Sequence, residues 1–423
     1  MLLLTSCSSF RPSGIIITLT PTPTIIPGAT FSPPCLETEV THSSITATPH
    51  PSLDIHPKLE STAVSAPELT IGPPPGIVYL SGASLWMVTM DGTSRLFVEQ
   101  SSGINKATFC STGERILIDN KETTGKYSIQ NLATGKIVGI SPGPDQYYCS
   151  VEWWGNRCDA LLAYPSSILD SHGDCWSYPV LIDMNGNSHV VGTSAAFPYY
   201  DAAASPSGAY LAYSDRGHPL LYHWGNGSTP LNFDKEVFPG CSYGFYYPSW
   251  SSDSSKVAWA VTGYMNGPSV EGIGIYDLSG NKFTFLYPFS ALDSYFTNMA
   301  WDPKQDYLMV HSRGNRLSVI KPDGTELFYV DKTVWQYLSP DGAWIAYGVY
   351  TNTGTIAYII SSDGQELHEL STSRNFTHWS PDSRYLVYQD RNGYVMVQTG
   401  KWVPYRLHLP SGAKLMDWVV NTP

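Results

Sequence analysis

Residues 338–347 read Leu-Ser-Pro-Asp-Gly-Ala-Trp-Ile-Ala-Tyr, and residues 379–388 read Trp-Ser-Pro-Asp-Ser-Arg-Tyr-Leu-Val-Tyr. In both stretches Pro restricts the backbone and Asp, Ser or Gly favours a turn, so the chain reverses between two strands. The run that follows is aliphatic and aromatic, which is typical of a strand buried on both faces. The stretches therefore predict a repeated β-hairpin, in which Asp341 and Asp382 hold their own turns.

Looser copies of this turn recur along the chain, so that it is found near positions 111, 155, 205, 251, 302, 339 and 380. A second turn follows each third strand, at Asp91-Gly92, Asn185-Gly186, Asn226-Gly227, Ser279-Gly280, Asp323-Gly324 and Asp363-Gly364. Asn-Gly and Asp-Gly favour a type I′ hairpin, because both central residues need positive φ. A short fourth strand comes next, so each unit is predicted to be a four-stranded antiparallel meander.

A sheet that is apolar on both faces must stack against neighbours, and a closed ring of such sheets is a β-propeller. The 348 residues from 76 to 423 give about 44 per unit for eight blades, which suits such repeats better than the about 50 of the seven-bladed alternative. Residues 77–98 supply three strands without a first one, and residues 416–420 supply an orphan first strand. We expect these two ends to share a blade and close the ring.

The Trp-Ser-Pro-Asp turn followed by an aliphatic-aromatic strand resembles the TolB-like or WD40-like (PD40) propeller repeat, over nearly all of residues 76–423. This family includes periplasmic TolB proteins, the propeller halves of prolyl-oligopeptidase-type peptidases and many bacterial surface lipoproteins. The resemblance therefore implies an all-β, single-propeller fold far more strongly than it implies a function.

The composition argues against several classes of protein. The net charge is −12 with only 24 basic residues, which does not suit binding to a phosphate backbone, so no nucleic acid partner is expected. No run of 18 or more apolar residues is present, so no helix is expected to span a bilayer. The low share of charged residues, 14%, fits stacked sheets that are buried on both faces.

The N-terminal 75 residues differ from the rest. Leu4-Thr5-Ser6-Cys7 resembles a bacterial lipobox, so residues 1–7 are interpreted as a truncated lipoprotein signal with Cys7 as the lipidated residue. In residues 8–76, Pro, Thr and Ser make up 33 of 69 positions, so 8–75 is predicted to be a disordered tether. These features predict an exported, envelope or surface protein that contacts the membrane only through a lipid anchor.

No catalytic or metal-binding motif is recognisable. The chain has no Gly-x-Ser-x-Gly, His-Glu-x-x-His, Cys-x-x-Cys or EF-hand pattern, so neither an enzyme nor a cofactor is expected. The loop 165–176 contains Asp170, His172, Asp174 and Cys175, but adjacent loop residues seldom converge on one ion, and no metal site is predicted. His218 and His223 flank a short hairpin and are interpreted as structural or exposed.

The candidate binding residues precede the first strands of the blades, on the face that also holds the loops between second and third strands. Aromatic rings and carboxylates recur there, which suits a peptide, a carbohydrate or a cation. The alternative is that the rings pack between blades and the carboxylates are solvated. The candidates are Asp145, Tyr147, Tyr148, Tyr199, Tyr200, Asp201, Tyr246, Tyr247, Asp293, Tyr295, Asp331 and Trp335.

Six cysteines lie beyond Cys7, and their number allows 15 complete pairings. Cys149 begins a first strand and Cys175 ends a loop on the same face of one blade, so these two form the preferred disulfide. Cys110 falls in a predicted inner strand and is expected to be simply buried.

The predicted function is non-enzymatic binding of a protein or peptide by a monomeric propeller at its loop-rich face. A carbohydrate-binding or glycan-processing site at the channel mouth is the alternative, and a purely structural spacer is a third. A glycan-processing site requires two carboxyl groups about 5–10 Å apart beside an aromatic plane, whereas a protein interface requires about 800 Å² on each partner.

Overall fold

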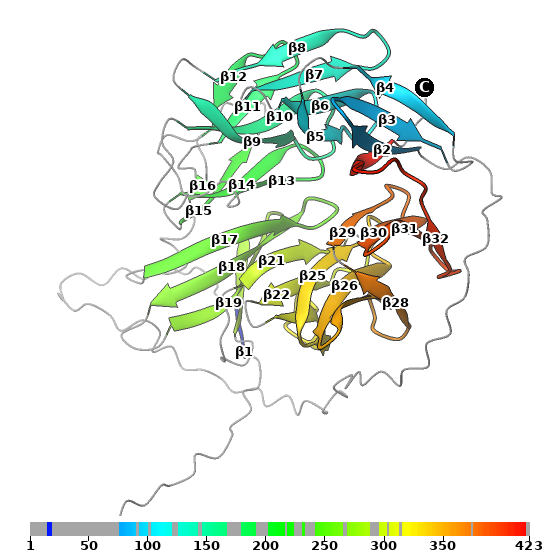
Figure 1. Ribbon diagram of the computed structural model, residues 1–423. Helices are drawn as coiled ribbons and strands as arrows, with labels where there is room; N and C mark the ends of the chain where they lie inside the picture. Colours follow the sequence, from blue (N-terminus) through cyan, green and yellow to red (C-terminus); the bar gives the residue numbers. More distant parts are fainter. Residues whose placement is uncertain are drawn as a thin grey trace, which may run out of the picture.

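The chain folds into eight β-sheets arranged in a ring (Figure 1), as seen in a computed structural model. The structure describes residues 15–18, 76–89, 93–99, 103–120, 126–142, 146–166, 179–191, 202–215, 218–223, 231–232, 242–264, 269–287, 296–302, 304–312, 315–373 and 375–419. None of these residues forms a helix of the length and apolarity that a membrane crossing needs. The structure therefore confirms the predicted fold, an all-β propeller with eight blades.

Each blade is an antiparallel sheet whose strands are hydrogen-bonded in the order in which they occur, from the channel outward. Blade 1 is the exception, because its innermost strand comes from the C-terminal end of the chain. It consists of β33 (Lys414–Val419), β2 (Gly76–Ser81), β3 (Ser84–Val88) and β4 (Ser94–Val98). Blade 2 consists of β5 (Ile104–Phe109), β6 (Arg115–Asn120), β7 (Tyr127–Asn131) and β8 (Ile137–Ile140). Blade 3 consists of β9 (Tyr147–Trp153), β10 (Ala160–Ser166), β11 (Val180–Asp183) and β12 (Ser188–Val190). Blade 4 consists of β13 (Ala202–Ala204), β14 (Tyr210–Asp215), β15 (His218–His223) and β16 (Leu231–Asn232).

The second half of the ring repeats this arrangement. Blade 5 consists of β17 (Ser242–Trp250), β18 (Lys256–Tyr264), β19 (Ser269–Asp277) and β20 (Lys282–Tyr287). Blade 6 consists of β21 (Phe296–Trp301), β22 (Leu308–Ser312), β23 (Arg316–Ile320) and β24 (Glu326–Val330). Blade 7 consists of β25 (Thr333–Leu338), β26 (Trp344–Thr351), β27 (Gly354–Ser361) and β28 (Leu367–Ser373). Blade 8 consists of β29 (Asn375–Trp379), β30 (Tyr385–Asp390), β31 (Gly393–Gln398) and β32 (Pro404–Arg406).

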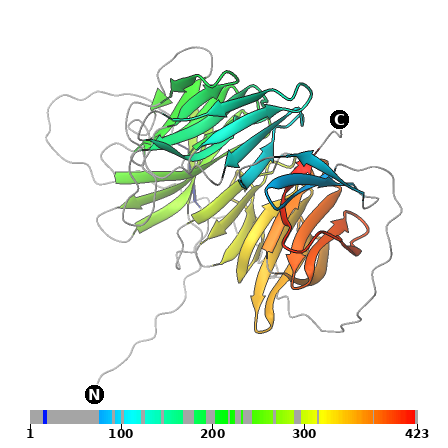
Figure 2. The same ribbon diagram turned by 45° about the horizontal axis from the view of Figure 1, so that its top comes forward.

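The two ends of the propeller segment close the ring in one sheet. The C-terminal strand β33 pairs antiparallel with β2, with Trp418 opposite Ile77 and Asp417 opposite Val78. Figure 2 shows the red C-terminal strand beside the blue strands of blade 1. The predicted closure, with the first strand of one blade supplied by the C-terminus, is therefore confirmed.

The Ser-x-Asp turn explains why the repeat is visible in the sequence. The Ser339 hydroxyl donates to Asp341 Oδ1 at 2.7 Å and accepts from Trp344 N at 3.0 Å. The equivalent bonds join Ser380 to Asp382 and to the next strand. The carboxylates thus hold their own turns, as predicted, because each also accepts a backbone N–H two residues later.

The second turn differs from the type I′ prediction. Gly186, Gly324 and Gly364 have φ of 85°, 90° and 75°, but the Asn or Asp before each is not among the residues with positive φ. In the first of these turns, Gly186 N donates to Asp183 O at 3.0 Å, and the Asp183 carboxylate accepts from two further backbone N–H groups. Only the glycine needs the left-handed region, since the preceding aspartate side chain stabilises an ordinary turn.

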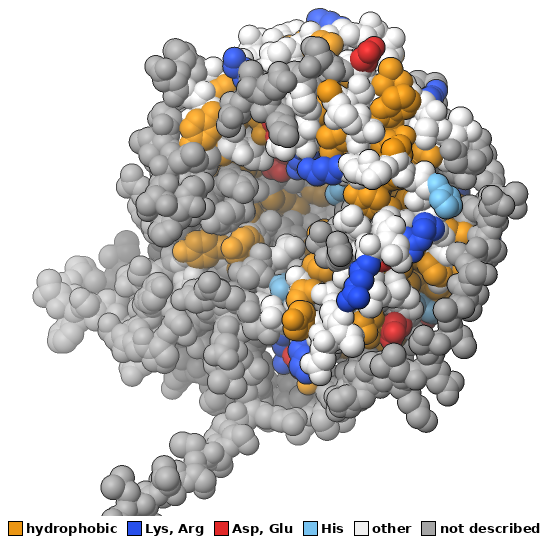
Figure 3. All heavy atoms as spheres, viewed as in Figure 1, with side chains coloured by type: hydrophobic (Ala, Val, Ile, Leu, Met, Phe, Trp, Pro, Cys, Tyr) orange, Lys and Arg blue, Asp and Glu red, His pale blue; other side chains and the backbone are white. Residues whose placement is uncertain are grey.

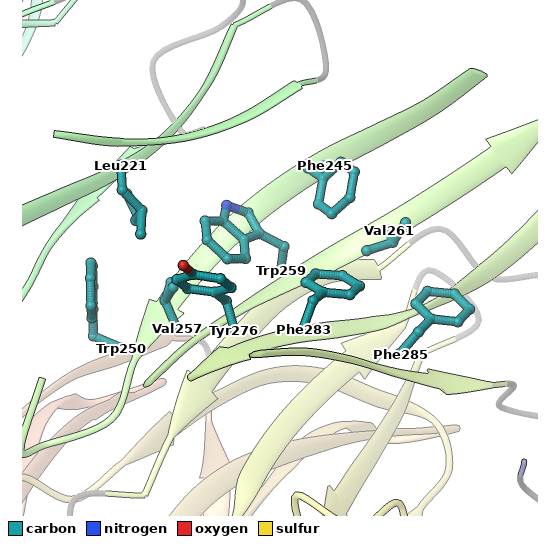
Figure 4. Packing of buried hydrophobic residues seen from close by; sticks show 10 residues of the cluster. Leu221, Phe245, Trp250, Val257, Trp259, Val261, Tyr276, Phe283 and Phe285 are labelled. Carbon is teal, nitrogen blue, oxygen red and sulfur yellow. The ribbon is translucent and has the colours of Figure 1, made fainter. Parts of the chain in front are cut away.

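The core is divided into eight clusters of buried apolar side chains, one between each pair of neighbouring blades. Between blades 4 and 5, Leu221 faces Trp250, Trp259 and Tyr276 (Figure 4). Burying one such side chain contributes about 1.5–3 kcal/mol. Because every cluster needs residues of two blades, no blade can bury its own faces alone.

Seven inner strands carry a β-bulge or a register irregularity in their pairing with the second strand: β33, β5, β9, β17, β21, β25 and β29. A bulge adds a residue to one strand and changes the direction in which neighbouring side chains point. The bulges therefore determine which side chains of the inner strands reach the channel.

A short strand departs from the predicted disordered tether. Within residues 8–75 the structure describes β1 (Ile15–Thr18), which pairs antiparallel with β20 as a fifth strand of blade 5, Ile16 opposite Leu286. Three consecutive isoleucines have a high β-propensity, and the outer edge of β20 offers unpaired backbone groups. The rest of residues 8–75 and the preceding residues 1–7, with Cys7, lie outside the described residues.

Candidate functional site

The channel is lined by the inner strands, whose equivalent positions can be compared blade by blade. We compare the residue that lies two positions before the start of the repeated turn in each inner strand. In β29, where the turn starts at Ser380, this residue is His378. In the other inner strands, in chain order, the corresponding residues are Thr108, Glu152, Ala203, Ser249, Ala300, Tyr337 and Asp417. Inner strands are covered by neighbouring blades on both faces, so a side chain exposed within them faces the channel. Glu152, Tyr337 and His378 are exposed in this way.

This level of the channel is asymmetric. Blades 7, 8, 1, 2 and 3 contribute Tyr337, His378, Asp417, Thr108 and Glu152. Blades 4, 5 and 6 contribute only small side chains, those of Ala203, Ser249 and Ala300. Figure 3 shows a hollow at the centre of the molecule, with acidic, basic and histidine side chains along its upper edge. The large polar groups therefore stand on one side of the channel, opposite a wall of small residues.

Lys106 of β5 lies near three of these groups, and together Lys106, Glu152, His378 and Asp417 form what we call the channel cluster. They come from the inner strands of four consecutive blades, 2, 3, 8 and 1. Asp417 is fixed in place, because its Oδ2 accepts from Phe109 N at 3.0 Å and its Oδ1 from Trp418 N at 2.8 Å. Among the described residues, the side chains of Lys106, Glu152 and His378 make no hydrogen bond or ion pair.

The channel environment changes the acidity of the cluster. The Glu152 side chain is accessible to water, yet protein surrounds its carboxyl so closely that desolvation raises its pKa to about 7, despite the nearby Lys106 ammonium. Desolvation also lowers the pKa of His378 and raises that of Asp417, while each of these two opposes the other's shift through its charge. Such shifts are typical of functional sites, and they arise here from desolvation of the three side chains.

A second candidate site lies on the face that holds the loops between second and third strands. A depression of about 530 Å³, which we call the blade 7–8 groove, is lined by Tyr350, Gly354, Thr355, Thr372, Ser373 and Arg391. Tyr350 is 66% exposed, the highest value among the large apolar side chains that the structure describes. Arg391 Nη2 donates to Thr353 O at 3.2 Å, so the hairpins of both blades are joined at this groove.

The structure does not bring the predicted aromatic ring together as one open surface. Tyr148 is 5% exposed and packs in the cluster between blades 2 and 3. Tyr246 and Tyr247 pack against the cluster between blades 5 and 6. Trp335 is half-buried and lies over Gly348, where an added Cβ would be 2.3 Å from its ring. At these four positions packing between blades, the alternative considered from the sequence, accounts for the aromatic side chains.

Of the other predicted site residues, two lie in the described part of the chain, and both are at least partly exposed. Asp331 is exposed in the turn between β24 and β25, and Tyr147 is partly exposed at the start of β9. Six further candidates lie outside the described residues: Asp145, Tyr199, Tyr200, Asp201, Asp293 and Tyr295. Ligand binding by these residues stays a prediction. Sequence reasoning missed the channel cluster, although Lys106, Glu152 and His378 share a signal, since each lies within four residues before the repeated turn.

The cysteines form a bond that the sequence did not indicate. Cys110 is buried, as predicted, but it is also disulfide-bonded to Cys158, with a Cα–Cα distance of 5.1 Å. Cys110 takes the place of the turn serine in blade 2, and Cys158 lies in the equivalent turn of blade 3, so stacking of the blades brings them together. Cys149 is disulfide-bonded as well, and its predicted partner Cys175 lies outside the described residues.

Metal ligands do not cluster in the part of the chain that the structure describes: no three His, Cys, Asp or Glu side chains there are arranged to hold an ion. Asp170, His172, Asp174 and Cys175 lie outside that part. His223 contacts the ring of Tyr210, with centroids 4.8 Å apart, which suits the predicted structural role.

The sequence matches no protein-family model and no curated protein. In fold the chain is similar to an oligogalacturonate lyase in complex with manganese, at 14% identity over 73% of this chain and 86% of the lyase (TM-score 0.48). It is similar to dipeptidyl peptidase 4 of Porphyromonas gingivalis, at 13% identity over 74% of this chain and 54% of the peptidase (TM-score 0.56). It is also similar to TolB of Acinetobacter baumannii, at 16% identity over 70% of this chain and 64% of TolB (TM-score 0.37).

These likenesses concern the fold alone, because the identities are 16% or less and the proteins include a lyase, a peptidase and TolB. The chain spans about half of the peptidase, 54% of its length. By its own sheets the chain is an eight-bladed β-propeller, and its likeness to the peptidase, at a TM-score of 0.56, concerns this fold.

Proposed function

We propose that this protein is a non-enzymatic binding module that docks an extended peptide or a peptide segment of a protein partner in the blade 7–8 groove. The observation that carries the proposal is Tyr350, a large aromatic side chain that is 66% exposed and lines a depression on the loop-rich face. Tyrosine supplies a large contact area at a low entropic cost and is enriched among the residues that dominate binding energy. Hydroxyl groups of Thr355, Thr372 and Ser373 line the same groove and would hydrogen-bond the backbone of a peptide.

A carbohydrate ligand is the second candidate, because an exposed aromatic plane beside hydroxyl groups also suits a sugar. Binding is favoured over glycan processing here, since none of the six residues that line the groove is Asp or Glu. Acid-base cleavage of a glycosidic bond normally needs a pair of carboxyl groups. The groove therefore supports recognition rather than hydrolysis.

The test is a selection of peptides from a displayed library on the folded chain, with a glycan array in parallel. We expect the selected peptides to bind the Tyr350→Ser variant at least tenfold more weakly, since loss of a central aromatic anchor costs about 2 kcal/mol or more. Ile137→Ser is the matched control, because Ile137 is 59% exposed on the outer strand β8. Peptide binding that Tyr350→Ser leaves unchanged would contradict the proposal, and glycan binding lost in this variant would favour the second candidate.

We further propose that the propeller is monomeric, exported and lipid-anchored at Cys7. The lipobox-like Leu4-Thr5-Ser6-Cys7 supports the anchor, and the Cys110–Cys158 disulfide supports an oxidising compartment. Labelling with a palmitate analogue in a bacterial host should mark the wild-type chain and not Cys7→Ala. Equal labelling of both chains, or labelling of neither, would count against the anchor without affecting the proposed groove.

A further inference from the structure

Lys106 and Glu152 carry opposite charges on the inner strands of neighbouring blades, and both are exposed to the channel. They lie close enough for the Lys106 ammonium to act on the Glu152 carboxyl through its charge. Their charged atoms are nevertheless more than 4.0 Å apart, since the two residues form no ion pair. The Lys106 ammonium and the Glu152 carboxylate thus face the same channel without forming an ion pair.

We propose that the channel cluster binds a small zwitterion, a molecule with one ammonium and one carboxylate group, which bridges Glu152 and Lys106. The ammonium of the ligand pairs with the Glu152 carboxylate, and its carboxylate pairs with the Lys106 ammonium. A ligand with a single charge satisfies only one of the two groups and leaves the other enclosed and unpaired, which is costly. The chemistry therefore selects both charges together, as in an amino acid or the end of a short peptide.

The surroundings of the pair favour this occupant. The side chains of Ala203, Ser249 and Ala300, opposite the cluster, are small and therefore occupy little of the channel. Asp417 is held in one position beside the pair, because each of its oxygens accepts a backbone N–H group. In the described part of the chain, no three His, Cys, Asp or Glu side chains are arranged to hold a metal ion.

Binding should depend on pH in a defined direction. Enclosure in the channel raises the pKa of Glu152 to about 7. Only its carboxylate form attracts an ammonium, so affinity should rise as the pH rises through 7 and fall in acid. The groups that face Glu152 from the neighbouring strands are Lys106, His378 and Asp417, and desolvation lowers the pKa of His378.

The test is isothermal titration calorimetry on the full chain with glycine, β-alanine and 4-aminobutyrate, which differ in the separation of the two charges. Methylamine and acetate serve as half-ligands, and glycylglycine distinguishes a peptide end from a free amino acid. We expect at least one zwitterion to saturate below about 10 mM, tenfold more tightly than either half-ligand. Glu152→Gln and Lys106→Met should each weaken this binding at least tenfold. Lys414→Met is the control, because Lys414 Nζ instead donates to Asn105 O at 3.4 Å.

A readout without substitutions covers the case in which a variant fails to fold. In the wild-type chain, nuclear magnetic resonance titration of the Glu152 carboxyl should give a lower pKa when the bound zwitterion is present. The proposal is overturned if no zwitterion saturates, if acetate or methylamine binds as tightly, or if the Glu152 pKa is the same with and without ligand. Because none of these residues lines the blade 7–8 groove, failure here leaves the proposed peptide site intact, and the reverse also holds.

Discussion

The indole Nε1 of Trp418 donates a hydrogen bond to the backbone carbonyl of His378, at 3.3 Å, across the boundary at which the ring closes. The same bond joins Trp379 to Tyr337, Trp250 to Ala203 and Trp153 to Thr108, each time from one blade to the blade before it. The tryptophan before the repeated turn therefore acts as a link between blades, and at Trp418 it links the C-terminal strand to blade 8.

Replacing Trp418 should weaken this closure in two separable ways. Trp418→Phe keeps the packing of a large ring but loses the hydrogen bond, which should lower the free energy of unfolding by about 1 kcal/mol. Trp418→Ala also leaves a cavity beside Tyr385, with which Trp418 stacks, and should cost about 3–5 kcal/mol. Urea unfolding measures both values. A Trp418→Phe variant as stable as wild type would contradict a hydrogen-bond contribution, and equal stabilities of the two variants would contradict a packing contribution.

The Cys110–Cys158 disulfide should stabilise the contact between blades 2 and 3. It closes a loop with a sequence separation of 48 residues, for which restriction of the unfolded chain predicts about 4 kcal/mol as an upper value. Cys158→Ser should therefore lower the free energy of unfolding by about 2–4 kcal/mol under oxidising conditions. The difference between wild type and variant should disappear in a reducing buffer. A difference that persists there would mean that Cys158 acts through packing instead.

Gly348 should tolerate no side chain, because Trp335 occupies the space above it. A Cβ at this position would lie 2.3 Å from the indole ring, so Gly348→Ala should lower the free energy of unfolding by about 1–3 kcal/mol. Gly139→Ala in the outer strand β8 is the matched control, since no atom lies within 4 Å of its added Cβ. Thermal unfolding of both variants checks the prediction, and similar shifts in Tm would show that Trp335 simply moves aside.

Glu152 should make the stability of the fold depend on pH. Its pKa is raised from 4.5 to about 7 by desolvation, so the folded state binds this proton more strongly than the unfolded state does. The contribution of the protonated Glu152 carboxyl to the free energy of unfolding is complete below pH 4.5, and it is lost as the pH rises through 7. Relative to wild type, Glu152→Gln should therefore gain stability between these values, because its amide stays neutral.

The measurement is urea unfolding of wild type and Glu152→Gln at several pH values from 4.5 to 8. Lys106, His378 and Asp417 titrate or carry charge in both proteins, so the difference between the two curves isolates Glu152 to a first approximation. A constant difference across the range would mean that Glu152 has an ordinary pKa, and that water in the channel solvates it fully.

The repeat made most of the fold predictable. Ser339, Asp341 and the strand after them form a turn through bonds within six residues, so neighbouring side chains suffice to specify it. The closure by residues 416–420 was predictable because a blade without a first strand needs one. The type of the second turn was not predictable. Whether the Asp183 carboxylate accepts hydrogen bonds from the backbone N–H groups of Asn185 and Asn187 depends on the geometry of the finished hairpin.

The candidate sites were less predictable, because burial in a propeller depends on which blades become neighbours. The sequence marks Tyr148 and Trp335 as aromatic but does not tell whether a ring faces a ligand or the next blade, and the structure packs both against neighbouring blades. Cys110 and Cys158 are 48 positions apart and meet only because equivalent turns of adjacent blades lie side by side. Tyr350 was not distinguished from other strand tyrosines until its exposure was known.

The sequence by itself determined that residues 76–423 repeat a four-stranded unit and must close into a ring, because local turn chemistry and two-sided apolar strands leave few other arrangements. The tertiary structure decided which side chains share the channel. Lys106, Glu152, His378 and Asp417 are spread over more than 300 positions of the chain, yet they meet because ring closure places blade 8 beside blade 1 and the inner strands around one axis. Bulges in these strands direct the side chains, and that geometry exists only after every blade has its two neighbours.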